Sequence, residues 1–147
     1  MKNVVLCDID HTISDASRRD YLLDNRPIDW YGYHSIAGGD EPVDAIVDLI
    51  RALDSQGYVV IGLTARPEKW RGITVDWLVR HDIPLEDLIM RPDDGFTPAA
   101  ELKYNLAIDH FGSETELKSR VSLVLDDRDD IVEKFNGLGL VTLQVKI

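Results

Sequence analysis

The fold of this chain is decided by the stretch Val4-Val5-Leu6-Cys7-Asp8-Ile9-Asp10-His11-Thr12. An apolar, β-branched run that stops on two carboxylates predicts a buried strand whose acidic residues lie where the strand meets its loop. In an open parallel α/β sheet, ligands bind at that carboxyl edge. Asp8 and Asp10 carry like charges two residues apart, which repel unless a cation or a shared proton offsets them. We therefore expect this pair to have a partner.

The length and composition are typical of a globular domain. The 147 residues suit one domain, residues 1–147, with its own hydrophobic core. No apolar run approaches the roughly 20 residues that cross a bilayer, and no signal segment opens the chain. The single cysteine, Cys7, excludes an internal disulfide and fits a reducing compartment. We expect Cys7 to be a small buried hydrophobe, and the protein to be cytoplasmic and without membrane partners.

The charge balance is strongly acidic. A formal net charge of −11 argues against a passive electrostatic binder of nucleic acid, which is normally basic. A divalent cation at a carboxylate cluster could neutralise part of this excess. The remainder is typical of a solvated surface.

Residues 13–39 interrupt the alternation of strands and helices, and we interpret them as a small cap inserted over the sheet edge. Arg18, Arg19 and Arg26 in this segment could meet a substrate phosphate or pair with surface acid. Trp30, Tyr31 and Tyr33 could stack a nucleobase, which is worth about 1–3 kcal/mol per base. Aromatic residues are more often the core of such a small insertion, and we expect this for at least two of the three.

The rest of the chain alternates between helical and strand patterns. Such alternation predicts a three-layer, Rossmann-like α/β fold with a parallel sheet. Four helices are predicted. The first is capped by Asp40, has Pro42 in its first turn and ends at Gly57, and the second has Ile73, Trp77 and Leu78 on its inner side. The third runs from Pro98 to Gly112 with Ala99, Leu102, Leu106 and His110 inward, and the fourth covers 131–135. Four further strands are predicted, over 58–63, 88–90, 121–125 and 141–145. Residues 64–67 close the first of these, and a loop over 91–95 follows the second.

Ionic or reactive groups follow three of these strands. They are Asp8 and Asp10, then Thr64 and Arg66, then Asp126 and Asp127, with Lys103 on the helix before the last pair. Each is a weak signal alone, because acidic strand ends are often turns or caps. Placed on one sheet edge, the carboxylates can hold Mg²⁺, and an aspartate there can attack phosphorus. A second aspartate can transfer protons, while a threonine, a backbone amide and a lysine spread the charge of the phosphoryl group.

Four motifs in this order resemble those of the haloacid dehalogenase (HAD) superfamily of phosphatases. They are Asp8-Ile-Asp10-His-Thr12, Leu63-Thr64-Ala-Arg66, Lys103 and Leu125-Asp126-Asp127-Arg128. Within the superfamily the chain looks most like the 3′-phosphatase domain of the bacteriophage polynucleotide kinase-phosphatase. The resemblance spans essentially the whole chain. The phosphate-binding loop of a kinase half is absent from the sequence.

The resemblance implies a role for each matching residue. Asp8 would be the nucleophile and Asp10 the general acid/base, whose main-chain carbonyl would also bind Mg²⁺. Lys103 would clamp the nucleophile and the phosphate. The metal ligands would be Asp8, Asp10, Asp127 and Asp126, and the substrate and phosphate would be bound by Thr64, Ala65, Arg66 and Ile9. Arg128 is expected to brace the acidic loop by ion pairing, and His34, His81 and His110 to be structural or on the surface.

The sequence departs from the family pattern at two positions. His11 stands where most of the superfamily has glycine, so the loop after the nucleophile should be less free. The related domain has an aspartate one helical turn before its motif-three lysine, where this chain has Ala99. Glu101 is near but lies on another helix face, so it does not replace that aspartate in orienting Lys103.

These observations predict a Mg²⁺-dependent phosphomonoester hydrolase that works through an aspartyl-phosphate. By resemblance the substrate is a 3′-phosphate on a nucleic-acid end or a nucleotide. The acidic balance keeps a mononucleotide phosphatase as an alternative, because long strands favour a basic track. A non-enzymatic phospho-acceptor receiver is a third alternative. The order of motifs disfavours it, because a receiver's acceptor aspartate sits alone on a middle strand.

Overall fold

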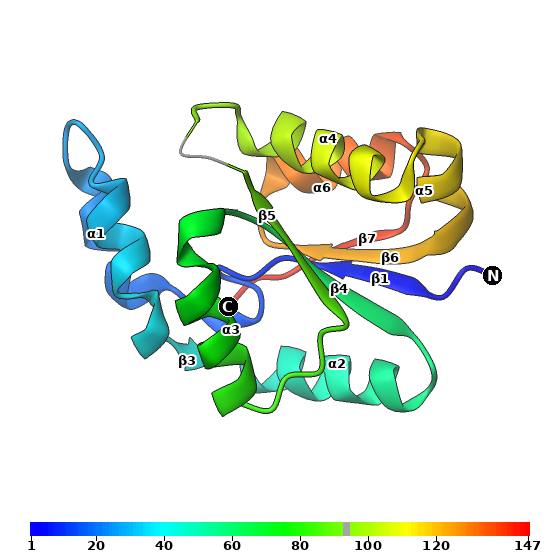
Figure 1. Ribbon diagram of the computed structural model, residues 1–147, viewed down its shortest axis with the longest axis horizontal. Coiled ribbons are helices and arrows are strands. Elements are labelled where there is room, and N and C mark those ends of the chain that lie inside the picture. The colour runs from blue at the N-terminus through cyan, green and yellow to red at the C-terminus, as the bar shows by residue number, and fades with distance from the viewer. Residues whose placement is uncertain (93–94) are drawn as a thin grey trace.

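The computed structural model describes residues 1–92 and 95–147, and its centre is a five-stranded parallel sheet in the order β5-β4-β1-β6-β7 (Figure 1). The strands are β1 (Val4–Cys7), β4 (Val59–Pro67), β5 (Asp87–Arg91), β6 (Val121–Asp126) and β7 (Thr142–Gln144). The predicted α/β fold is confirmed. Asp93 and Asp94, in the loop predicted over 91–95, lie outside the described residues.

Helices cover both faces of the sheet and enclose two cores (Figure 1). Side chains alternate between the faces of a strand, so Val5 and Cys7 pack towards one side while Val4 and Leu6 pack towards the other. Cys7 is fully buried among apolar residues, as predicted. The first face is covered by α2 (Asp44–Ser55) and α3 (Arg71–Arg80), and the second by α4 (Ala99–Phe111), α5 (Glu114–Arg120) and α6 (Asp129–Gly137).

The strand order places the acidic residues at a reversal of the chain's direction across the sheet. From β1 the chain adds β4 and β5 on one side, and then crosses to add β6 and β7 on the other. Cys7 pairs with Leu125 of β6, and the amide of Asp8 donates to the Leu125 carbonyl at 2.9 Å. Asp8 and Asp126 therefore leave the sheet side by side at a topological switch point, where open α/β sheets bind ligands.

The segment between β1 and α2 contains short elements. They are β2 (Ser14–Asp15), η1 (Ser17–Asp24), α1 (Trp30–Ser35), η2 (Ala37–Gly39) and β3 (Glu41–Pro42). The antiparallel pairing of β2 with β3 joins the two ends of this segment. In Figure 1 this blue segment extends beyond the carboxyl end of β1, where the predicted cap was expected.

Three details of the predicted helices were wrong. Asp40 does not cap α2, which begins at Asp44, because the Asp40 carboxylate is buried in an ion pair with Arg19, and Pro42 belongs to β3. His110 is exposed on α4 rather than inward. Helix α5 was not predicted, although Ser113 caps it by accepting a hydrogen bond from the amide of Glu116.

No helix within the described ranges combines the length and the apolar character that a membrane span requires.

Candidate active site

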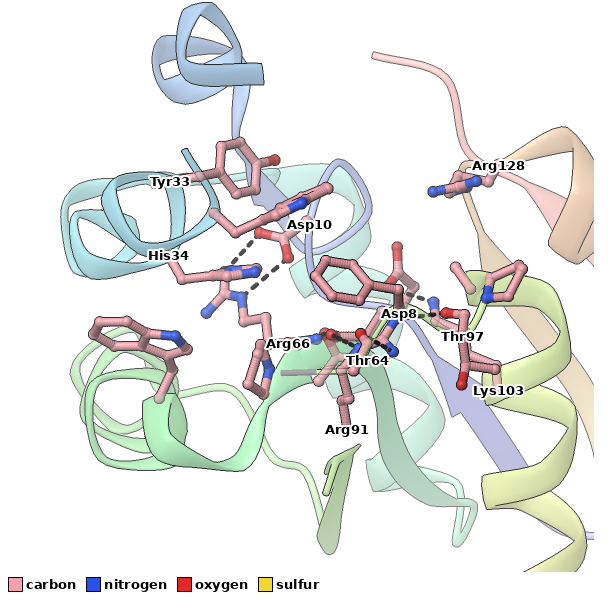
Figure 2. A pocket seen from close by; sticks show the side chains of 18 of the residues that line it. Asp8, Asp10, Tyr33, His34, Thr64, Arg66, Arg91, Thr97, Lys103 and Arg128 are labelled. Atoms are coloured by element: carbon pink, nitrogen blue, oxygen red, sulfur yellow. Dashed lines mark hydrogen bonds and ion pairs between the residues drawn. The ribbon is translucent and has the colours of Figure 1, made fainter. Parts of the chain in front are cut away.

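The carboxylate of Asp8 is held on both of its oxygens. The ammonium group of Lys103, on α4, donates to Oδ1 at 2.8 Å, and the hydroxyl of Thr12 donates to Oδ2 at 3.1 Å. All three side chains are buried. Asp8 and Lys103 lie close together in Figure 2, with Thr64 of β4 beside them. The structure thus brings together the predicted nucleophile and the predicted lysine, which are 95 positions apart in sequence.

Lys103 bridges two strand ends. Its nitrogen lies 2.6 Å from Oδ2 of Asp126, at the end of β6, as well as 2.8 Å from Asp8. These two carboxylates orient the lysine without the aspartate that Ala99 replaces. Burial alone would lower the pKa of Lys103, but the charges of Asp8 and Asp126 outweigh it and raise that pKa above its ordinary value. Lys103 is therefore a fixed positive charge at neutral pH.

The electrostatics around Asp8 call for more positive charge than Lys103 supplies. Burial raises the pKa of Asp8 well above its ordinary value, Lys103 partly opposes this, and the neighbouring Asp126 raises it further. Burial also raises the pKa of Asp127. One carboxylate oxygen from each of these three aspartates lies within 4.8 Å of the other two. Three clustered carboxylate oxygens suit Mg²⁺, which prefers hard oxygen ligands and takes its remaining ligands from water.

Asp10 faces arginines rather than this carboxylate group. Arg66 donates to Oδ2 from Nε at 3.0 Å and to Oδ1 from Nη2 at 2.8 Å (Figure 2). Arg19 donates to Oδ1 at 2.5 Å. Burial would raise the pKa of Asp10, but the charge and hydrogen bonds of Arg66, joined by those of Arg19, lower it far below its usual range. The charge of Asp10 is thus offset by arginines, and its carboxylate is not one of the three clustered carboxylates. Its main-chain carbonyl as a ligand stays a prediction.

The sequence-based reasoning missed the role of Arg19. This side chain is 0% exposed, and it bonds both oxygens of Asp40 as well as Asp10 and the carbonyl of Tyr33. Neither alternative considered for it, a substrate phosphate or surface acid, matches this buried network. The repulsion between Asp8 and Asp10 did indicate that a cation lies nearby. No local sequence pattern identified Arg19 as that cation.

The predicted phosphate-binding residues differ in what they present to the site. Thr64 and Ala65 line the cavity above the sheet edge, and the Thr64 hydroxyl accepts a hydrogen bond from the amide of Arg66 at 3.1 Å. The guanidinium of Arg66 is buried on Asp10 and Thr74, so a substrate contact by Arg66 stays a prediction. Ile9 buries its side chain in the core, and its carbonyl anchors the turn after Asp8. Ile9 could therefore bind phosphate only through its main chain.

Two further sequence-based expectations concern the loops beside the site. His11 has φ of 60°, a left-handed conformation that favours glycine, which explains the glycine usual at this position. Its ring nitrogen Nε2 lies 3.0 Å from Asp20. Arg128 pairs with Asp130 at 2.9 Å, and its amide donates to Asp126, so its predicted bracing of the acidic loop is confirmed.

One cavity of about 770 Å³ contains Asp8 and Thr64 and extends to α1 of the insertion. Of the three aromatic residues considered there, Tyr33 is 5% exposed, whereas Trp30 and Tyr31 are 46% and 67% exposed. The expectation that at least two of the three form the core of the insertion is therefore wrong. Trp30 and Tyr33 share a face of the helix, with ring centroids 6.0 Å apart, but only Tyr33 is buried; Tyr31 lies on another face.

The chain matches the sequence model of one protein family. The family described as the polynucleotide kinase PNKP phosphatase domain matches residues 2–147. No curated protein is significantly similar to the chain in sequence.

Similar folds occur in solved structures. A chain in the structure of a Pnkp1/Rnl/Hen1 complex is 27% identical with a TM-score of 0.79; the match covers 99% of this chain and 45% of that one. A predicted phosphatase from Clostridium acetobutylicum is 13% identical with a TM-score of 0.70, over 98% of this chain and 84% of that one. YfnB from Bacillus subtilis, described as a HAD hydrolase and solved bound to magnesium, is 13% identical with a TM-score of 0.68, over 97% and 86%. This chain thus spans less than half of the Pnkp1-complex chain, and the last two likenesses concern the fold alone.

Proposed function

This chain belongs to the PNKP phosphatase domain family of HAD phosphatases, and on that premise we propose that it is a Mg²⁺-dependent enzyme that removes a 3′-phosphate from a nucleic-acid end or a nucleotide. The observation that carries the proposal is the placement of Asp8. Its carboxylate lies at the switch point of the sheet, lines a cavity of about 770 Å³, and is oriented by Lys103 and Thr12. A carboxylate held in this way is equipped to act as a nucleophile.

In the first step Asp8 is proposed to attack phosphorus. A new bond forms between a carboxylate oxygen of Asp8 and phosphorus, and the bond from phosphorus to the ester oxygen breaks. Lys103 and the hydroxyl of Thr64 would stabilise the charge on the phosphoryl oxygens. Mg²⁺ held by Asp8, Asp126 and Asp127 would supply positive charge that makes the phosphate dianion tolerable beside these carboxylates.

Asp10 is proposed to transfer the protons of both steps. The departing ester oxygen takes a proton from Asp10, and Asp10 then takes one from the water that attacks phosphorus. That water breaks the bond between phosphorus and Asp8, which releases inorganic phosphate and restores the enzyme. Arg19 and Arg66 favour the ionised form of Asp10, which suits the proton acceptor of the second step. The negative charge of the arriving phosphate, in the same cavity as Asp10, would raise the proton affinity of Asp10 for the first step.

The insertion over 13–39 is proposed to act as a cap within a single domain. It supplies Arg19 to the buried network around Asp10, and it supplies Trp30, Tyr31 and Tyr33 to the lining of the cavity. The cap therefore contributes both to the positioning of a catalytic side chain and to the surface that a substrate meets.

The test is release of inorganic phosphate from a matched panel of substrates. The panel contains one oligonucleotide with a 3′-phosphate, the same oligonucleotide with a 5′-phosphate, and 3′- and 5′-mononucleotides, each with Mg²⁺ and with EDTA. We expect Mg²⁺-dependent release from the 3′-phosphates and none from Asp8→Asn. Release from 5′-mononucleotides alone would replace the proposed substrate by that of a nucleotidase while keeping the mechanism. Undiminished release by Asp8→Asn would refute the mechanism itself.

A further inference from the structure

Aromatic side chains from two separate elements form a continuous surface within the cavity. Trp30 and Tyr31 come from α1 of the insertion, and Trp70 comes from η3 (Glu68–Trp70), which follows β4. The ring centroids of Tyr31 and Trp70 are 5.1 Å apart, and Trp30 stacks on His34 with an interplanar angle of 17°. We refer to Trp30, Tyr31 and Trp70 together as the aromatic wall.

A cation lies on this wall. The ammonium nitrogen of Lys69 is 5.5 Å from the ring centroid of Tyr31 and 5.5 Å from that of Trp70. Lys69 also lines the cavity and is exposed. An aromatic surface with a cation at its edge is the combination that binds single-stranded nucleic acid, because bases stack on the rings while the cation attracts the backbone.

The aromatic wall is continuous with the proposed phosphate site. Both line the same cavity, and β4 connects them directly, since Thr64 lies within β4 and η3 begins immediately after Pro67. A strand rises about 3.3 Å per residue, so Pro67 lies roughly 10 Å beyond Thr64. The wall is therefore too far from Thr64 to hold the same phosphate, and it is placed to meet the rest of a nucleotide chain.

The exposure of Trp30 and Tyr31 separates these two rings from the core of the insertion. Tyr33 is buried beneath the wall and carries the cation–π contact with Arg19, with the guanidinium carbon 4.3 Å from the ring centroid. Trp30 and Tyr31, by contrast, are exposed and line the cavity. The formal charge of the whole chain is −11, but among the described residues the lining of this cavity is not acidic: it combines three carboxylates, Asp8, Asp10 and Asp127, with five cations, Arg66, Lys69, Arg91, Lys103 and Arg128.

We propose that the aromatic wall and Lys69 form a binding site for the single-stranded nucleotides next to the scissile phosphate. Trp30, Tyr31 and Trp70 stack the bases, and Lys69 contacts a phosphate that joins two nucleotides. This inference rests on the proposed function, which it deepens by identifying the residues that make a strand a better substrate than a mononucleotide. Stacking is tolerant of sequence, so the site selects strand length rather than base identity.

The first test compares substrates of increasing length. For the wild-type enzyme we expect kcat/KM to be about tenfold or more higher for a 3′-phosphorylated tetranucleotide than for a 3′-mononucleotide. A tenfold rise corresponds to the stacking of one additional base on the wall. In Tyr31→Ala most of this rise should disappear, mainly through KM, and the loss of kcat/KM should be much larger with the tetranucleotide than with p-nitrophenyl phosphate. Tyr31→Phe should keep the rise, because it keeps the ring. In Lys69→Gln the slope of log KM against log salt should fall by about 0.7, the value of one single-strand phosphate contact.

The control is Tyr21→Ala, an equally exposed tyrosine of the insertion that does not line the cavity. It should behave as wild type with every substrate. A wild-type kcat/KM that is independent of strand length would overturn the inference. So would a Tyr31→Ala enzyme that loses activity on p-nitrophenyl phosphate and on the tetranucleotide in equal proportion, since that result indicates a structural role.

A second measurement separates failure of this inference from failure of the proposed function. The quenching of tryptophan fluorescence by an unphosphorylated single-stranded oligonucleotide reports binding to the wall without any hydrolysis. In Asp8→Asn we expect the oligonucleotide to quench the fluorescence. Adding Tyr31→Ala to this variant should raise the Kd for the oligonucleotide about tenfold. If such binding occurs but no 3′-phosphate is released, the proposed function fails and the wall remains a strand-binding site. If phosphate is released but no binding is detected, the wall is refuted and the proposed function stands.

Discussion

Arg66 donates two hydrogen bonds to the carboxylate of Asp10, at 3.0 Å from Nε and 2.8 Å from Nη2, although 56 positions separate the two residues. The second aspartate of the Asp-x-Asp motif therefore has its charge offset by a guanidinium group, whereas the first, Asp8, is paired with Lys103. The like-charged pair is separated into two environments. Asp8 lies beside the carboxylates that fit a metal, and Asp10 lies in an arginine network.

Replacing Arg66 by lysine should impair turnover without unfolding the protein. Lysine keeps the charge but cannot make both hydrogen bonds to Asp10, so the carboxylate loses its fixed orientation. We expect kcat to fall on the order of 10²-fold, the effect of misplacing a catalytic group by about 1 Å. Steady-state kinetics check this. Arg71→Lys is the matched control, because Arg71 makes a similar two-bond contact with Glu68 on the surface.

The pH dependence of stability should carry the signature of Asp10. Its pKa is lowered in the folded protein, so the unfolded chain binds this proton more readily. The resulting stabilisation is fully present above the unfolded pKa of about 3.9 and is lost as pH falls below it, by about 1.4 kcal/mol per pH unit. Urea unfolding between pH 5 and pH 3, at about one-unit steps, measures this. The free energy of unfolding should fall less steeply with decreasing pH in Asp10→Asn than in the wild type. Equal slopes in the two proteins would contradict the assignment.

Asp8 should contribute to that pH dependence with the opposite sign. Burial raises its pKa in the folded state, so its protonation stabilises the fold as pH falls through that value. The comparison for Asp10 is therefore cleanest in an Asp8→Asn background, where this opposing contribution is absent.

Substituting the nucleophile should remove turnover while preserving the fold. Asp8→Asn keeps the size of the side chain and loses the attacking carboxylate, so we expect phosphate release to fall on the order of 10³-fold or more. Asp10→Asn should lose most, but not all, of the turnover. Circular dichroism confirms the fold of each variant. An Asp8→Asn enzyme with measurable burst release of product would show that another group attacks phosphorus.

Magnesium should stabilise the protein measurably. A ligand at about 100 times its Kd adds about 2.7 kcal/mol to the free energy of unfolding, which raises Tm by several degrees in a chain of this size. Differential scanning fluorimetry with MgCl₂, against NaCl at the same ionic strength, checks this. Asp127→Asn removes one of the three clustered carboxylates and should reduce the shift. An unchanged shift in that variant would place the bound ion elsewhere.

Removing Arg19 should destabilise the fold strongly. Arg19→Ala removes the hydrogen bonds to the buried carboxylate of Asp40 and leaves it the ion pair with Arg18 at 3.2 Å. Losing one partner of a buried pair costs about 3–5 kcal/mol, and the remaining pair with Arg18 places the expected loss at the lower end. Urea unfolding at neutral pH measures the loss. Arg26→Ala is the control, because Arg26 lies in the same insertion, is exposed, and donates only to nearby carbonyls. Equal stabilities of the two variants would show that the Arg19 network does not support the insertion.

Some of the site could be predicted because it depends on local pattern. The apolar run ending at Asp8 and the similar run ending at Asp126 each indicate a strand with acid at its end, and parallel strands place such ends at one edge. Helix α4 follows from its apolar spacing and from Gly112, which adopts φ of 92° at its end. The placement of Lys103 against both carboxylates then follows from its position on that helix.

The partners of Asp10 could not be predicted in the same way. Arg19 lies in a segment without apolar periodicity, and its burial depends on how the insertion folds back over the sheet edge to meet Asp40. Asp40 itself has the sequence pattern of a helix cap, but its carboxylate is used in that ion pair instead. The exposure of Trp30 and Tyr31 likewise depends on how helix α1 packs, because Tyr33 and His34 are the residues that this helix buries.

The amino-acid sequence by itself determined the alternating elements, the parallel sheet and the three strand ends that carry acid, threonine and acid again. Periodicity and turn residues act between neighbours in the chain, so they can be read directly from it. The tertiary structure alone decided which cation meets which carboxylate, and which aromatic rings face the cavity. Those outcomes depend on the burial of charges contributed by distant segments, where an unpaired group is costly and any suitable partner in space can satisfy it.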